Sequence, residues 1–251
     1  MKNKAIKSRY DFMIIFDAEN VNRYDEAVDN KRIVGEIRKY VECVKKDIPG
    51  YEVYTEDTHR EKMEKAYRSF ALKSKREKRQ QITPERQLQK WMCKRYFDVR
   101  AFGADMIVGE NPGGMLKGPI HLGNIKSVDT DSDNPTCNPT YALYKVESSI
   151  SVILAEKTGF SDDDLELFLN ALENIFKNNN GVSSNQKITI RKLIVFKHKN
   201  SLGNAAPQKV FESVKITRKD NISSAAKGYS DYDIKIDYGN LPVNVEIRER
   251  V

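Results

Sequence analysis

Residues 91–129, WMCKRYFDVRAFGADMIVGENPGGMLKGPIHLGNIKSVD, combine the end of a helix, two β-patterned segments and a glycine-rich loop. Trp91 and Met92 close an amphipathic helix, and residues 99–102 are expected to be extended. The Gly and Pro residues that predict a loop here are Gly109, Pro112, Gly113, Gly114 and Gly118. Backbone amides freed by such a loop, next to lysines at a strand end, are suited to holding phosphate. The stretch therefore predicts a nucleic-acid-binding element.

The N-terminal third alternates between strand and helix patterns. Residues 11–17 are apolar on both faces, as in a central strand of a sheet. Apolar residues recur at helical spacing over residues 31–46, and Pro49-Gly50 ends that helix. Residues 58–80 predict a basic helix with a thin apolar stripe. Such a helix either follows a phosphate backbone or presents a solvated face, and the solvated face is the commoner arrangement.

Helix starts and β patterns organise the remainder of the chain. Thr83 precedes Pro84 and Glu85, which suit a first helical turn. Ser161 precedes the aspartates at 162–164, and we interpret this acidic cluster as a helix cap and not as a cation site. The β patterns cover residues 141–155, 187–197, 209–217 and 231–237. A β-α-β arrangement with an antiparallel sheet accounts for these segments.

Charge and cysteine content narrow the class of protein. The 251 residues contain 43 Lys and Arg against 36 Asp and Glu, a net charge of +7, which favours an anionic partner, nucleic acid first. The three cysteines, Cys43, Cys93 and Cys137, are widely spaced and form no C-x-x-C pair. No stretch approaches the length of a membrane span. We therefore expect a soluble protein of the reducing cytoplasm, with no membrane partner.

Several segments resemble one protein family in that family's own order. The central ones are FDVRAFGADM at 97–106 and KGPIHLGNIKSVD at 117–129. The others are RYDFMIIFDAEN at 9–20, LAEKTGFSDDDLELFLNALENIF at 154–176, RKLIVFKHKNSLGNAAPQKVF at 191–211 and YSDYDIKID at 229–237. Together they resemble the backbone subunit of type I-C CRISPR surveillance (Cascade) complexes, the Cas-seven family, in a shortened and divergent form.

The resemblance implies a fold and a domain organisation. The fold is α+β, with a ferredoxin-like, RNA-recognition-motif-like core, an antiparallel sheet and an inserted helical subdomain. Residues 1–49 and 97–251 would form the core, and residues 50–96 the insertion.

The resemblance also implies a partner and a set of contacts. Subunits of this family coat the CRISPR guide RNA as a head-to-tail filament, with copies of themselves and other Cascade subunits as partners. The residues matching the central motif are Arg100, Gly113, Gly114, Lys117, His121, Asn124, Lys126 and Ser127. The cations would bind phosphates, and Asn and Ser would bond phosphate or 2′-hydroxyl oxygens. His121 would stack on a base or sugar, and none of these contacts would read sequence.

Two segments depart from the family pattern. The family has a loop of the type GNPNGDP where this chain has ENVNRYDEAVDN at 19–30, and a long thumb where this chain has residues 130–140. These departures leave open an alternative to the RNA-binding subunit. In that alternative, the chain is a mimic from a phage or other mobile element, an anti-CRISPR protein that docks on the complex and blocks assembly.

Catalytic and metal-binding motifs are missing from the sequence. His59, His121 and His198 are scattered, and no H-E-x-x-H pattern or cysteine pair has metal-ligand spacing. We therefore predict a protein without enzymatic activity, metal or cofactor. A metal-free endoribonuclease using His121 as general base is a second alternative, although a lone His in a β pattern is more often structural.

Overall fold

A computed structural model describes residues 4–19, 29–76, 82–108, 111–129, 141–177, 187–220 and 226–251. The chain forms two compact units. Unit 1 comprises residues 1–6, 38–121 and 151–168, and unit 2 comprises residues 7–37, 122–150 and 169–251. Residues 50–96, predicted as a helical insertion, lie within unit 1.

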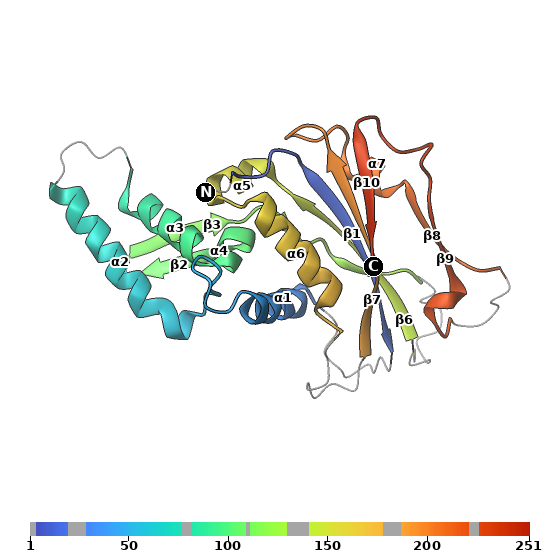
Figure 1. Cartoon of the computed structure of the whole chain (residues 1–251), viewed down its shortest axis with the longest axis horizontal. Helices are drawn as coiled ribbons and strands as arrows, with labels where there is room; N and C mark the ends of the chain where they lie inside the picture. The colour runs from blue at the N-terminus through green and yellow to red at the C-terminus, as the bar shows by residue number, and fades with distance from the viewer. Residues whose placement is uncertain are drawn as a thin grey trace. The chain divides into compact units, whose positions relative to one another are not determined.

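The sheet of unit 2 is antiparallel throughout. Strand β1 (Tyr10–Glu19) lies between β6 (Tyr141–Ile150) and β7 (Lys187–His198), with Tyr10 opposite both Ile150 and Lys197 (Figure 1). β10 (Val245–Arg250) pairs with β7, and β5 (Ile125–Ser127) pairs with β6. These contacts confirm the predicted antiparallel sheet.

Chain order identifies the topology. Helix α1 (Asn30–Val44) follows β1, and α6 (Asp162–Asn174) lies between β6 and β7 in the sequence. With β5 and β6, these elements give the β-α-β-β-α-β order of the ferredoxin-like fold, interrupted by a long insertion between α1 and β5. The α+β fold class predicted from the sequence is confirmed.

Both faces of β1 are buried. Phe12, Ile14 and Phe16 alternate along the strand with Met13 and Ile15, and none of these side chains is more than 1% exposed. Met13 and Ile15 join a cluster that also holds Leu143, Ile194, Phe196, Val210, Val214 and Tyr232. β1 therefore has no solvent-facing side on which bases could stack.

The cover on the face of Met13 and Ile15 comes from the C-terminal part of the chain. Helix α7 (Pro207–Phe211) contributes Val210, and strands β8 (Val214–Arg218) and β9 (Tyr232–Ile236) contribute Val214 and Tyr232. β8 and β9 form an antiparallel hairpin, and the 3₁₀ turn η1 (Tyr229–Asp231) precedes β9. The predicted strand at 209–217 is thus a helix followed by a strand.

Unit 1 is built mainly from helices around one hairpin. Its elements are α2 (Glu56–Arg76), α3 (Pro84–Arg95), α4 (Phe97–Phe102), β2 (Gly103–Val108), β3 (Asn111–Lys117), β4 (Ile120–His121) and α5 (Val152–Thr158). Met63, Leu88, Met92, Tyr96 and Val99 form its core cluster with Cys93 and Met106. Unit 1 also includes the second part of α1 and the first part of α6.

Both predicted helix starts are confirmed. Thr83 Oγ1 accepts a hydrogen bond from the Arg86 amide at the start of α3. Ser161 Oγ accepts one from the Asp164 amide, and the Asp164 carboxylate accepts one in return from the Ser161 amide. This reciprocal pair of hydrogen bonds is a capping box.

The expectation of an extended backbone at residues 99–102 is wrong, because these residues form the end of α4. Asp98 holds this helix in place by accepting a hydrogen bond from the Tyr54 amide and pairing with Arg38. Burial raises the pKa of Asp98, and the same hydrogen bond and ion pair oppose that rise. Gly103, at φ +85°, then ends the helix. Residues 152–155, within the predicted strand at 141–155, are also helical and belong to α5.

Candidate nucleic-acid interface

The predicted RNA-binding residues fall in both units. Gly113, Gly114 and Lys117 lie on β3 and His121 on β4, all within unit 1. Asn124, Lys126 and Ser127 lie at or on β5, within unit 2. Lys117, His121, Asn124, Lys126 and Ser127 are all exposed. We call residues 117–127 the central segment.

Side chains of unit 2 hold the backbone at the second half of the central segment. The Asn30 side-chain amide donates to the carbonyl of Gly123 at 3.1 Å, and the Gly123 amide donates to Ser148 Oγ at 3.3 Å. A Cβ on Gly123 would lie 2.0 Å from the Glu147 carbonyl oxygen, so only glycine allows this approach to β6. The close approach leads directly into the pairing of β5 with β6.

Two lysines face each other across β5 and β6. Lys126 is opposite Lys145, and like charges in directly opposed positions repel. Glu147 lies near both ammonium groups, with 3.7 Å from Oε2 to Lys126 Nζ and 2.8 Å from Oε1 to Lys145 Nζ. A phosphate that binds Lys126 must therefore compete with a carboxylate already present.

No described carboxylate competes with a ligand for Lys117, His121 or Asn124. Their side chains make no hydrogen bond or ion pair with any other residue that the structure describes. Ser127 Oγ donates to the Asp129 carbonyl at 3.0 Å, which leaves its lone pairs free to accept. These polar groups suit a phosphate or a ribose hydroxyl.

The prediction for Arg100 needs correction. Arg100 is only 7% exposed. Its guanidinium forms a bidentate ion pair with Asp164, at 2.6 Å from Nη2 to Oδ1 and 3.0 Å from Nε to Oδ2. Nη1 donates to the carbonyls of Cys93 and Gly50 at 2.7 and 3.1 Å. Arg100 joins three segments of unit 1, and its guanidinium is occupied by these partners.

The glycine-rich stretch is a strand and not the predicted loop. Residues 111–117 form β3, and the register shift between Asp105 and Ile107 leaves Gly113 and Gly114 opposite Met106. Gly114 has φ +81°, as expected for a glycine in a β-bulge. A Cβ on Gly118 would lie 2.3 Å from the Phe102 carbonyl carbon, which requires glycine there for packing. Gly114 and Gly118 thus each have a structural reason within the fold.

One described histidine and one described cysteine have structural surroundings. His198 is buried, with Nε2 2.9 Å from Asp11 Oδ2 and Nδ1 accepting from the Asn204 amide at 2.8 Å, so it is a structural residue. Burial raises the pKa of the Cys93 thiol to about 12, which keeps it protonated at neutral pH. Within the described ranges, no group of three or more His, Cys, Asp or Glu side chains could hold a metal ion.

Fold and surface together define an α+β protein of ferredoxin-like strand order with an exposed, basic central segment. The chain belongs to the family described as CRISPR-associated protein Cas7, whose model matches residues 8–137 and 136–237. Membership of the Cas-seven family, predicted from the sequence, is thereby confirmed. A comparison with curated proteins found no significant match. Among the described residues, no helix combines the length and apolar character needed to cross a membrane.

Proposed function

We propose that the protein is a non-enzymatic backbone subunit of a type I-C-like Cascade complex that binds guide RNA without sequence specificity. Membership of the Cas7 family supports a role in a Cascade-like complex. The observation that carries RNA binding is the exposure of Lys117, His121, Asn124 and Lys126 within the short central segment. The buried faces of β1 favour this segment over the sheet as the RNA-binding surface.

The chemistry of the central segment suits a sugar-phosphate backbone. Lysine provides a point charge for phosphate, and the Asn124 amide and Ser127 hydroxyl can bond phosphate or 2′-hydroxyl oxygens. These contacts leave the base edges unread, as a guide that must pair with a target requires. His121 is the candidate for stacking on a base or sugar.

The proposed partners are guide RNA, further copies or type I-C backbone subunits, and other Cascade subunits. A head-to-tail filament needs two complementary surfaces on each subunit. The two segments in which the chain departs from the family pattern fall largely on residues 20–28 and 130–140, which lie outside the described residues. Assembly is therefore part of the proposal and needs a direct test.

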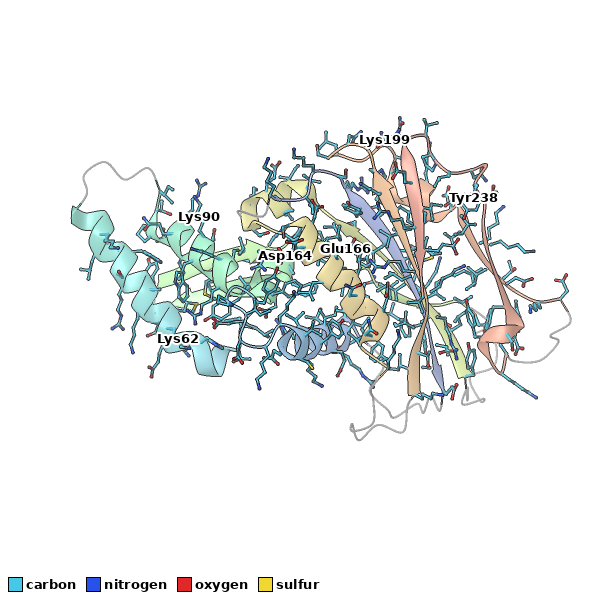
Figure 2. The ribbon with its side chains drawn as sticks, viewed as in Figure 1. Lys62, Lys90, Asp164, Glu166, Lys199 and Tyr238 are labelled. Carbon is cyan, nitrogen blue, oxygen red and sulfur yellow. The ribbon has the colours of Figure 1, made fainter. Side chains whose placement is uncertain are left out.

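The test compares two double variants. Each variant replaces one lysine in unit 1 and one lysine in unit 2. Lys117→Ala with Lys126→Ala removes the proposed ligands, and Lys62→Ala with Lys199→Ala is the matched control (Figure 2). Lys62 and Lys199 are exposed, and their side chains have no ion pair within the described ranges. Affinity for single-stranded RNA should fall with salt, and the salt slope of the first variant should decrease by about one to two units. An unchanged slope would refute the central segment as the phosphate site.

Co-purification with a type I-C complex tests the biological role. Recovery of the protein together with guide RNA is the expected result. Recovery in the complex without RNA is the result that the anti-CRISPR mimic would give. Labelled RNA incubated with magnesium, manganese or a chelator should stay intact, and cleavage that His121→Ala abolishes would establish an endoribonuclease instead.

A further inference from the structure

Unit 1 contains a cavity of about 400 Å³ lined by α3, α5, the start of α6 and the turn at Gly50 and Tyr51. Its volume lies within the range of small-molecule sites. Its charged lining residues are four cations and two anions, namely Lys90, Lys94, Arg100 and Lys157 with Glu156 and Asp164. The cavity shares no lining residue with the central segment.

Charge is unevenly matched in this cavity. Arg100 and Asp164 neutralise each other through their bidentate pair. Lys90, Lys94 and Lys157 are exposed, and none of their ammonium groups has an ion pair within the described part of the chain. Among the lining residues, Glu156 is the one carboxylate apart from Asp164. The cavity is therefore cationic. Its lysines are not ion-paired with a described carboxylate that a phosphate ligand would have to displace.

The cationic surface continues from the cavity along α3. Arg86, Lys90 and Lys94 follow one another at intervals of four residues, so they share one face of the helix with a rise of about 6 Å per step. All three are exposed (Figure 2 labels Lys90). A row of cations suits a strand with successive phosphates better than it suits a single ion.

The aromatic residue that lines the cavity, Tyr51, already contacts other side chains through its ring. Tyr51 has Lys45 Nζ 5.1 Å and Arg100 Cζ 5.5 Å from its ring centroid, and its ring stacks with Phe97 at 6.4 Å between centroids. These contacts leave the ring poorly placed to stack on a base. Burial raises the pKa of the Tyr51 phenol, which therefore stays neutral and can donate a hydrogen bond. Recognition would then depend on phosphate and sugar.

We propose that this cavity is a second anion site that binds a phosphate-bearing ligand, one nucleotide unit of a nucleic-acid strand. Lys90, Lys94 and Lys157 contact the phosphate, and Arg86 contacts a neighbouring phosphate on the same strand. The proposal goes beyond guide-RNA binding by the central segment and does not depend on it. It rests on the cavity and its unmatched lysines.

The experiment measures binding of uridine monophosphate, a short oligouridine and polyglutamate to the full chain. Backbone amide signals of Gly50 and Gly159, which line the cavity, are the reporters, and those of Gly228 and Gly239 in unit 2 are the controls. Uridine monophosphate and oligouridine should shift the reporters and leave the controls in place. Tighter binding of the oligouridine would identify a strand as the natural source of the phosphate, and equal affinity would identify a free nucleotide.

Variants separate this site from the central segment. The triple variant Lys90→Ala, Lys94→Ala, Lys157→Ala should weaken uridine monophosphate binding by about tenfold or more, and Lys62→Ala should not change it. The double variant Lys117→Ala, Lys126→Ala should show the same reporter shifts as the wild type, even if it no longer binds RNA at the central segment. The thermal midpoint of the triple variant should match the wild type because its lysines are exposed.

Three outcomes would overturn the proposal. The first is that neither uridine monophosphate nor oligouridine shifts the Gly50 and Gly159 signals, whether or not RNA binds the central segment. The second is a shift with polyglutamate alone, which would make the cavity a docking site for an acidic protein segment. The third is a reporter shift that persists unchanged in the triple variant.

Discussion

The lysines of the cavity and those of β5 and β6 differ in one respect that affects ligand binding. Lys126 and Lys145 share Glu147, whereas Lys90, Lys94 and Lys157 have no ion pair among the described residues. An exposed ion pair contributes only about 0.2–1 kcal/mol, so phosphate can displace Glu147, but binding is weakened by that amount. Exposure thus identifies a candidate cation, and the surrounding carboxylates determine how available it is to a phosphate.

The largest expected effect is on Arg100, the one cavity cation that is fully paired. Arg100→Ala should lower the free energy of unfolding by about 3–5 kcal/mol, because it leaves Asp164 buried without its partner. Arg86→Ala on the exposed face of α3 should change it by less than about 0.5 kcal/mol. Chemical denaturation of both variants measures the difference. Equal stability of the two variants would contradict the structural role of Arg100.

The next effect concerns the cavity wall. Thr158 Oγ1 is buried and has no hydrogen-bond partner within the described part of the chain. Thr158→Val should raise the free energy of unfolding by about 1–3 kcal/mol, since it removes an unsatisfied polar group while preserving shape. Thermal unfolding monitored by circular dichroism measures the change. Destabilisation would mean that the hydroxyl has a partner, such as a bound water or ligand.

A smaller effect is expected where Glu147 bridges two lysines. Glu147→Gln should raise RNA affinity by about two- to fivefold and steepen its salt dependence, because Lys126 and Lys145 are released together. Glu246→Gln on β10 makes the same change in net charge at an exposed position and is the control. Fluorescence anisotropy over a salt series measures both variants. Equal gains would show that only net charge matters.

The smallest effect concerns a surface pair of unit 2. The hydrogen bond from Lys192 lowers the pKa of Glu249 below its ordinary value of 4.5. The pair therefore contributes at neutral pH, and this contribution is lost as the pH falls from the ordinary value through the lowered one. Partial exposure limits it to less than about 1 kcal/mol. The difference in unfolding free energy between wild type and Glu249→Gln should shrink on acidification, and a difference that grows would contradict the pairing.

Sequence patterns predicted the elements whose periodicity is long and uniform. The buried strand β1, the helices α1 and α6, and the starts of α3 and α6 follow from apolar spacing and local capping. The short run at 99–102 was misassigned because a largely buried turn of helix and a buried strand have similar apolar composition. The glycines of β3 were likewise taken for a loop, because composition does not distinguish a β-bulge from a turn.

The family and the α+β class could be predicted from the sequence, because both depend on patterns local to the chain. The central segment could be selected from its motif, and its RNA contacts stay a prediction. The sequence also contains the signal for the row of cations on α3, which sequence reasoning missed: Arg86, Lys90 and Lys94 are spaced four residues apart. The buried pair of Arg100 with Asp164, and the grouping of Lys157 with Lys90 and Lys94, could be seen only in the folded chain. The physical reason is distance along the chain. Arg100 and Asp164 are 64 residues apart, and only folding sets which charges meet and which stay open to a ligand.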